Sequence, residues 1–300
     1  MDKKNESEIL GRIQRGGMLL DGAMGTELMK RGLPPGRSPE LWNIEKPDLV
    51  QAVHRSYYKA GADAVLTNSF GGNHIKLDAH GLGDRCHELN KQAALLAVAV
   101  RPEMRFVGGS MGPTGQFLEP QGTYTENDFE NAYALQAAAL SAGGVDFILI
   151  ETQYDIREAL CALRSARRSC DLPVFVTMTF NLTPRGFFTI MGNSVKACFE
   201  VLENAGAQAL GANCTLDSRE MADLTRIMRQ VTDIPILVQA NAGQPELTPE
   251  GDVSYAQGVE DYVRYIPEMI AAGADIIGGC CGTDAEYIRR MSDIIKSNRD

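Results

Sequence analysis

The chain has 300 residues, of which 44% are hydrophobic and 23% charged, and its 29 basic and 39 acidic residues give a net charge of −10. Acids and bases are interspersed along the sequence, which argues against a nucleic acid or an anionic membrane as the main partner. The N-terminal residues lack the apolar core of a signal peptide, and no apolar run approaches the roughly 20 residues of a membrane span. We therefore expect a globular, cytoplasmic protein with a large buried core.

The chain is expected to begin with a polar extension, residues 1–16, followed by one domain over residues 17–300. Within that domain a short apolar, β-branched run recurs eight times, and each run ends in glycine or a small polar residue. The runs are 17–22, 63–70, 105–112, 146–153, 173–180, 209–215, 235–243 and 275–282. Such nearly continuous hydrophobicity is typical of parallel strands covered on both faces.

Amphipathic segments alternate with these runs. The expected helices are 48–60, 84–100, 126–142 with Thr125 as its cap, 155–169, 193–205, 217–231, 258–272 and 284–297. Eight strands alternating with eight helices predict an α/β fold, a single-domain (β/α)8 TIM barrel. The alternative is a doubly wound open sheet, but the regular repeat and the absence of a GxGxxG motif after the first strand argue against it.

Polar residues stand where the expected strands end, which is the end of a barrel that carries the chemistry. They are Asp21, Thr67, Asn68, Ser110, Glu151, Asn181, Cys214, Asn241, Cys280 and Cys281. This coincidence is the main functional signal in the sequence.

The seven cysteines are too few and too unevenly spaced for a disulfide scaffold, so we interpret them as reduced thiols. Adjacent cysteines make a poor disulfide, because a trans peptide holds their Cα atoms about 3.8 Å apart, below the roughly 4.4 Å that a relaxed bridge needs. Cys280 and Cys281 are therefore either packed thiols or metal ligands.

Three cysteines are expected to converge, because Cys214 ends the sixth strand and the Cys280–Cys281 pair ends the eighth, on either side of the seventh. Neighbouring strands lie about 4.8 Å apart. Zinc favours thiolate ligands in a tetrahedron, and a catalytic site keeps one position open. Three thiolates leave zinc electron-rich, which suits activation of an incoming thiol. The side-chain oxygen of Asn241, at the end of the seventh strand, is a possible displaceable fourth ligand. The alternative is that these cysteines are small buried hydrophobes.

Several stretches carry a resemblance to a known family. They are LDGAMGTEL (20–28), AGADAVLTNSFGGN (60–73), GSMGPTG (109–115), GVDFILIETQYD (144–155), GANC (211–214), NAGQP (241–245) and GGCCGT (278–283). In this order and spacing they make the chain similar, from about residue 10 to 295, to the homocysteine S-methyltransferase family of zinc-dependent barrels.

The resemblance implies zinc on Cys214, Cys280 and Cys281. It also implies that the ammonium of homocysteine lies near Glu151 and Asp21, and that its carboxylate meets backbone N–H groups around Ser110 and Met111. Thr67 and Asn241 complete the expected substrate site.

Within the family, NAGQP and ELWN (40–43) look more like the homocysteine-binding module of cobalamin-dependent methionine synthase than like the S-methylmethionine or betaine branches. We expect homocysteine to be methylated to methionine, as its thiolate, the fourth ligand of zinc, attacks a separate donor. The first candidate for the donor is a methylated corrinoid (methylcobalamin) protein; free methylcobalamin and small sulfonium or ammonium compounds are others. Alternatives are a different thiol acceptor, demethylation toward a corrinoid partner, a module of a longer enzyme, and a non-catalytic zinc barrel that docks a corrinoid protein.

Overall fold

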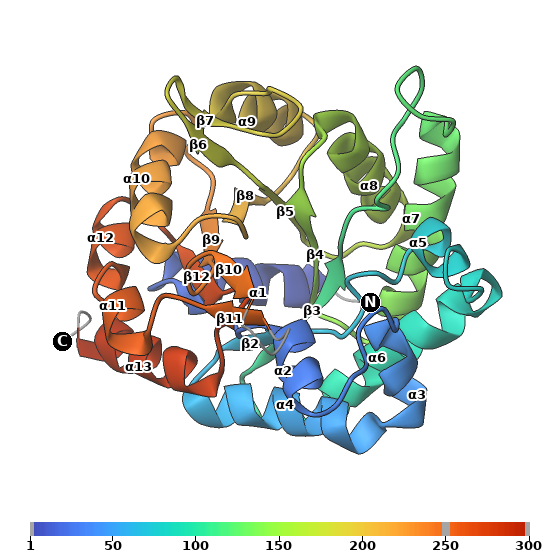
Figure 1. The fold of residues 1–300 in the computed structure, drawn as a ribbon, viewed down its shortest axis with the longest axis horizontal. Helices are drawn as coiled ribbons and strands as arrows, with labels where there is room; N and C mark the ends of the chain where they lie inside the picture. Colours follow the sequence, from blue (N-terminus) through green and yellow to red (C-terminus); the bar gives the residue numbers. More distant parts are fainter. Residues whose placement is uncertain (1–2, 248–252, 298–300) are drawn as a thin grey trace.

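The computed structural model describes residues 3–247 and 253–297. Its centre is a sheet of eight parallel strands ringed by helices (Figure 1). The strands are β1 (Met18–Leu19), β2 (Ala64–Leu66), β3 (Phe106–Met111), β4 (Phe147–Gln153), β5 (Val174–Met178), β8 (Ala209–Asn213), β9 (Ile236–Ala240) and β12 (Ile276–Gly279). Each lies within one of the eight runs expected from the sequence.

The strands follow one another in the order β1, β12, β9, β8, β5, β4, β3, β2. The two end strands meet, because the Asp63 N–H donates to the Leu19 carbonyl at 2.7 Å and the Leu66 N–H donates to Asp21 Oδ2 at 2.8 Å. The sheet is thus a nearly closed parallel barrel, and the prediction of a TIM barrel is confirmed.

The outer helices agree with the expected segments, with one exception. They are α4 (Pro47–Ala60), α6 (Cys86–Ala99), α7 (Glu126–Ala142), α8 (Ile156–Ser169), α9 (Val195–Asn204), α10 (Ser218–Arg229), α11 (Val259–Val263), α12 (Ile266–Ala271) and α13 (Ala285–Ser297). Thr125 caps α7 through a reciprocal pair of hydrogen bonds with Asp128, as expected. The expected helix 258–272 is instead two helices, since Pro267 in the first turn of α12 cannot continue a preceding helix.

Two antiparallel hairpins and several short helices were not expected from the sequence. The hairpins are β6 (Asn181–Thr183) with β7 (Gly186–Phe188) and β10 (Pro245–Leu247) with β11 (Val253–Tyr255). The short helices are α2 (Met24–Lys30), α3 (Trp42–Glu45), α5 (His74–Asp78) and the 3-10 turns η1 (Pro39–Leu41) and η2 (Gly83–Arg85). Asn181 is exposed on its hairpin and so does not belong to the group of strand-end residues that face the barrel mouth.

The barrel interior is a packed core rather than a channel. Phe147 and Phe175 lie 5.0 Å apart between their ring centroids, among aliphatic side chains of the other strands. Helix α1 (Lys3–Gln14) adds Ile9 and Ile13, both buried, to this same cluster. The described part of the expected polar extension is therefore a helix that covers the N-terminal end of the barrel.

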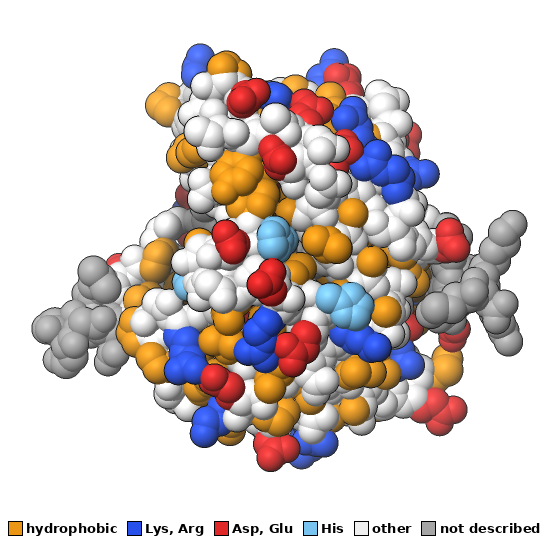
Figure 2. All heavy atoms as spheres, turned by 90° about the vertical axis from the view of Figure 1, so that its right-hand side faces the viewer, with side chains coloured by type: hydrophobic (Ala, Val, Ile, Leu, Met, Phe, Trp, Pro, Cys, Tyr) orange, Lys and Arg blue, Asp and Glu red, His pale blue; other side chains and the backbone are white. Residues whose placement is uncertain are grey.

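The surface is mixed in charge on the face made by the right-hand side of Figure 1, near α5 and α7. There acidic and basic side chains intermingle with hydrophobic ones (Figure 2). No helix among residues 3–247 and 253–297 is long and apolar enough to cross a membrane.

Candidate metal and substrate site

A cavity of about 490 Å³ opens at the C-terminal ends of the barrel strands. Of the site residues expected from the sequence, the structure brings the following together in its lining: Asp21, Thr67, Ser110, Glu151, Cys214, Cys280 and Cys281. Met111 and Asn241 do not line it. The predicted residues therefore bring three thiols and two carboxyl groups to the cavity. A third carboxyl group, that of Glu40, also lines it and accepts hydrogen bonds from the Gly71 N–H and the Ser38 hydroxyl, both at 2.6 Å.

The three thiols are close enough to share one ion. The Sγ atoms of Cys214 and Cys281 lie 3.7 Å apart, and all three sulfur atoms lie within 4.8 Å of one another. Zinc–sulfur bonds of about 2.3 Å in a tetrahedron place sulfur atoms about 3.8 Å apart. The cluster therefore fits the spacing that a tetrahedral zinc ion requires, with only small side-chain movements.

The backbone of β9 fixes the two segments that carry these thiols. The Cys214 N–H donates to the Gln239 carbonyl at 3.1 Å, and the Cys280 N–H donates to the Ala240 carbonyl at 2.8 Å. Cys214 itself has a φ of +65°, a left-handed conformation that a non-glycine residue adopts rarely and at some cost in energy. The convergence of the ends of β8 and β12 across β9, expected from the sequence, is thus found in the structure.

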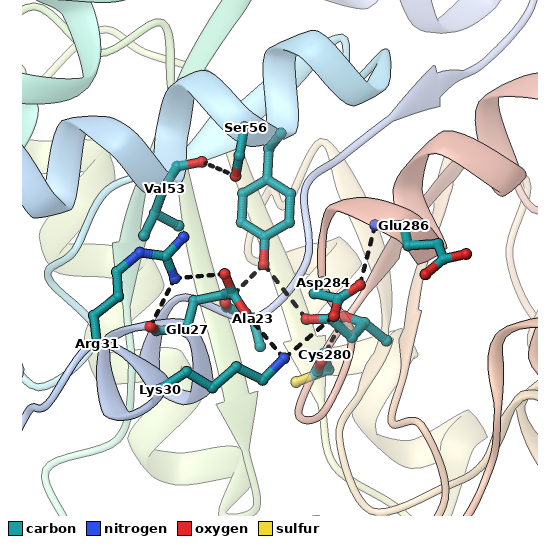
Figure 3. Close-up of polar contacts among 11 residues, drawn as sticks. Ala23, Glu27, Lys30, Arg31, Val53, Ser56, Cys280, Asp284 and Glu286 are labelled. Atoms are coloured by element: carbon teal, nitrogen blue, oxygen red, sulfur yellow. Dashed lines mark hydrogen bonds and ion pairs between the residues drawn. The ribbon is translucent and has the colours of Figure 1, made fainter.

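A second set of contacts holds the turn that contains Cys280 and Cys281 against the segment after β1 (Figure 3). The Thr283 hydroxyl donates to the Cys280 carbonyl at 2.7 Å, and the buried Tyr57 hydroxyl lies 2.8 Å from the Ala23 carbonyl and 3.4 Å from that of Thr283. Glycine is required at position 279, since a Cβ there would lie 2.2 Å from the Thr283 hydroxyl. Lys30 of α2 extends this contact with an ion pair to Asp284, 3.2 Å long.

The protonation of the thiols is shared within the cluster. Hydrogen bonds with Cys214 and Cys281, together with burial, raise the pKa of Cys280 well above its ordinary value. Hydrogen bonds from Cys214 and Cys280 lower the pKa of Cys281 to about 3. Three thiolates at this distance repel one another, so full ionisation of the cluster needs a cation among the sulfur atoms.

The carboxyl groups of Asp21 and Glu151 are buried. Burial raises the pKa of Asp21 well above its usual range, and one of its oxygens has no hydrogen-bond partner in the described structure. Burial also raises the pKa of Glu151 to about 7, although its hydrogen bond from the Ser110 hydroxyl opposes the rise. A cationic group that enters the cavity would find two carboxyl groups with little competing solvent.

The role of the Ser110 and Met111 N–H groups in binding the substrate carboxylate stays a prediction. The Ser110 N–H already donates to the Thr67 hydroxyl at 3.0 Å. The side chain of Met111 is fully buried in the core outside the barrel, because successive side chains of β3 point to opposite faces, so only its backbone is a candidate for contact with substrate. Thr26 is a further candidate, since it lines the cavity and its buried hydroxyl has no hydrogen-bond partner among the described residues.

Asn241 lies next to the cluster rather than in the cavity lining. It follows β9, and its N–H donates to the Leu216 carbonyl, while the next N–H, that of Ala242, donates to the Cys281 carbonyl at 2.9 Å. Its buried Oδ1 has no hydrogen-bond partner among the described residues. An unpartnered oxygen at this position is compatible with a displaceable metal ligand.

Sequence reasoning missed three residues of the site. Asn213 is fully buried and contacts Glu151, Thr152 and Cys280. Tyr255 of β11 lines the cavity, and its ring packs so closely on Gly282 that a Cβ there would lie 2.3 Å from it. Thr152 has a φ of +60°. Only Asn213 left a signal in the sequence, as a polar residue within an otherwise apolar strand.

The sequence profile of the homocysteine S-methyltransferase family matches residues 18–295. Among curated relatives, methionine synthase of Mycobacterium tuberculosis (strain ATCC 25618 / H37Rv) is 32% identical over 96% of this chain, and that of Mycobacterium leprae (strain TN) is 30% identical over 98%. The chain spans only about a quarter of the length of each, 25% and 26% respectively.

Solved structures share the fold. The metallated form of the homocysteine methyltransferase MmuM from Escherichia coli superposes with a TM-score of 0.79 at 24% identity, over 96% of this chain and 99% of that one. A methyltransferase from Methanosarcina mazei gives a TM-score of 0.64 at 10% identity, over 99% of both chains. Since the family profile covers almost the whole barrel, including all three clustered cysteines, this chain belongs to the homocysteine S-methyltransferase family.

Proposed function

We propose that this chain is a zinc-dependent methyltransferase that converts homocysteine to methionine. The observation that carries the proposal is the presence, in the lining of one cavity, of three thiols within 4.8 Å of one another and the buried carboxyl groups of Asp21 and Glu151. The family and the methionine synthase relatives support the same acceptor. No other arrangement of the described residues offers both a sulfur-rich metal site and a site for an amino group.

Cys214, Cys280 and Cys281 would hold the zinc ion. Zinc bound there supplies the positive charge that lets a substrate thiol lose its proton at neutral pH and remain a nucleophile. Since a structural zinc site closes its shell with four protein ligands, a site with three thiolates leaves room for the substrate.

Glu151 and Asp21 bind the ammonium group of the amino acid and so place its thiol over the cysteine cluster. The hydroxyl of Thr26 is the candidate partner of its carboxylate. In the transfer step a lone pair on the substrate sulfur forms the new S–CH3 bond while the bond from the methyl carbon to the donor breaks, and the donor keeps that electron pair. The buried walls of the cavity exclude water from the methyl group.

The proposed donor is a methylated corrinoid, carried by a partner or by another part of a longer chain. The methionine synthase relatives, about four times as long as this chain, support a donor supplied from outside the barrel. We also infer that the protein works in the reducing environment of the cytoplasm, because three thiols at this spacing are open to oxidation elsewhere.

Zinc K-edge X-ray absorption, without and with L-homocysteine, tests the acceptor. We expect three sulfur neighbours in the free protein and four after homocysteine is added. 4-Mercaptobutyrate, which has the same thiol and carboxylate but no amino group, is the matched control and should bind more weakly. A metal shell unchanged by either thiol would contradict the proposal.

Turnover with separate donors tests the second substrate. Methionine formation is measured with methylcobalamin, S-methylmethionine and betaine in turn. Activity with methylcobalamin supports the corrinoid donor, whereas activity only with a small donor would replace it. Zinc binding without methionine formation from any donor would contradict the proposed catalysis.

A further inference from the structure

We propose that Asn213 is a positioning residue that holds the amine-binding carboxyl group of Glu151 and the metal ligand Cys280 in one fixed arrangement. The inference rests on the proposed function, because it assigns Glu151 to the substrate and Cys280 to the metal. Asn213 is the last residue of β8, directly before Cys214, and its side chain is fully buried.

Its hydrogen bonds fix the orientation of the Asn213 amide. The Thr152 N–H, which can only donate, lies 2.8 Å from Oδ1, and the Thr177 hydroxyl also donates to Oδ1 at 2.8 Å. The Oδ1 atom is therefore fully used as an acceptor, and Nδ2 must face the opposite side. The assignment of oxygen and nitrogen, which is often ambiguous for a side-chain amide, follows here from chemistry.

The Nδ2 group of Asn213 has two hydrogens to donate, and three acceptors lie near it. It lies 2.8 Å from Thr152 Oγ1, 3.3 Å from Glu151 Oε2 and 3.8 Å from Cys280 Sγ. The shortest contact takes one hydrogen, so the second lies between the carboxyl group and the sulfur. Both of these groups carry negative charge in the proposed working state, and a single N–H group between them stabilises both.

Asn213 also stabilises an unfavourable backbone conformation next to Glu151. Thr152 has a φ of +60°, a left-handed conformation that a β-branched residue rarely adopts. The register of β4 with β5 shifts at this place, between Ile150 and Gln153. Asn213 binds both the N–H and the hydroxyl of Thr152, so this amide, together with the hydrogen bond from Ser110, fixes the direction in which Glu151 leaves the strand.

Few other side chains satisfy these contacts. Aspartate would retain the bonds to Oδ1 but lose both N–H donors, and serine would be too short to reach Glu151 and Cys280. Because the site is fully buried, solvent does not replace the lost donors. Removing a residue that hydrogen-bonds to a metal ligand and so orients it typically lowers metal affinity 10–100-fold.

The test compares Asn213→Ser with Asn90→Ser. Asn90 is another buried asparagine, bonded to the carbonyls of Gly72 and Cys86 between outer helices, and it lies outside the cavity lining. Zinc affinity is measured without substrate, by competition with a chromophoric chelator. The preference for homocysteine over 4-mercaptobutyrate is measured as the ratio of kcat/KM values, and the melting temperature of each variant reports folding.

We expect Asn213→Ser to lower zinc affinity 10–100-fold and the preference for homocysteine at least tenfold, whereas Asn90→Ser lowers only the melting temperature. In a Glu151→Gln background Asn213→Ser should cause no further loss of preference, because the two residues act through the same contact. If Asn213→Ser does not fold, Asn213→Asp, which keeps the shape and the bonds to Oδ1, is judged by the loss of preference.

Two results would overturn the positioning role. One is zinc affinity and preference within about twofold of the unmodified protein; the other is an equal loss in the Asn90 variant, which would indicate general destabilisation. An unmodified protein that shows no preference for homocysteine would contradict the proposed function instead, and zinc affinity would still decide the role of Asn213.

Discussion

Replacing Glu151 by glutamine should make the protein more stable and a poorer enzyme. Burial raises the pKa of this carboxyl group from its ordinary value of 4.5 to about 7. A raised pKa means that the folded state holds the proton more tightly than the unfolded chain does. The free energy of unfolding therefore falls as the pH rises from about 4.5 through about 7, and the loss is complete above that range.

The size of the effect follows from this change. At pH 8 the buried charge of Glu151 costs about 3 kcal/mol, and at pH 5 less than about 1 kcal/mol. Glutamine is neutral at both pH values and can still accept the hydrogen bond of Ser110. Its amide group would face Nδ2 of Asn213, at a cost of about 1 kcal/mol that does not depend on pH. Glu151→Gln should therefore gain about 2–3 kcal/mol relative to the unmodified protein between pH 5 and pH 8.

Urea denaturation of the metal-free, reduced proteins at the two pH values measures this gain, with far-UV circular dichroism as the probe. Glu200→Gln, at an exposed position on α9, is the control and should show no such difference. The same Glu151 variant should bind homocysteine at least tenfold more weakly. A stability difference between the Glu151 variant and the unmodified protein that is the same at pH 5 and pH 8 would refute the reasoning.

Three other changes test the site. Alanine at any one of the three clustered cysteines should abolish zinc binding and methionine formation together, while the control Cys170→Ala keeps both. Zinc content is measured by elemental analysis and activity by turnover. Full activity without zinc would contradict the metal site. Tyr57→Phe should lower zinc affinity several-fold and the free energy of unfolding by about 1 kcal/mol, because it removes the hydroxyl that donates to the Ala23 and Thr283 carbonyls. Chelator competition measures the zinc affinity and denaturation measures the stability. Unchanged values would mean that the hydroxyl is dispensable. The KM for homocysteine should rise as the pH falls below about 7, where Glu151 takes up a proton; a KM independent of pH between 5.5 and 8 would argue against its contact with the ammonium.

The barrel was predictable because its strands are buried on both faces. Parallel strands of this kind are continuous apolar runs in the sequence, and their order in a barrel follows the order in the chain. The meeting of Cys214 with Cys280 and Cys281 followed from that order alone. Their positions required no knowledge of the loops.

The features that the sequence did not reveal depend on contacts between distant segments. Asn181 was grouped with the strand ends, but it begins an exposed hairpin that is too short and too polar to carry a strand signal. The left-handed conformation of Thr152 exists because Asn213, 61 residues later, bonds to it.

Helix α1 has a consequence for the order of events during a reaction. Ile9 and Ile13 close the N-terminal end of the barrel, and the interior above them is filled with side chains, so among the described residues no channel reaches the cavity along the barrel axis. Under the proposed function, homocysteine must reach the cysteines before the methyl donor covers the open end of the cavity. The methylated product then leaves only after the donor withdraws. Kinetics with the two substrates should accordingly be sequential and ordered, with homocysteine first on and methionine last off.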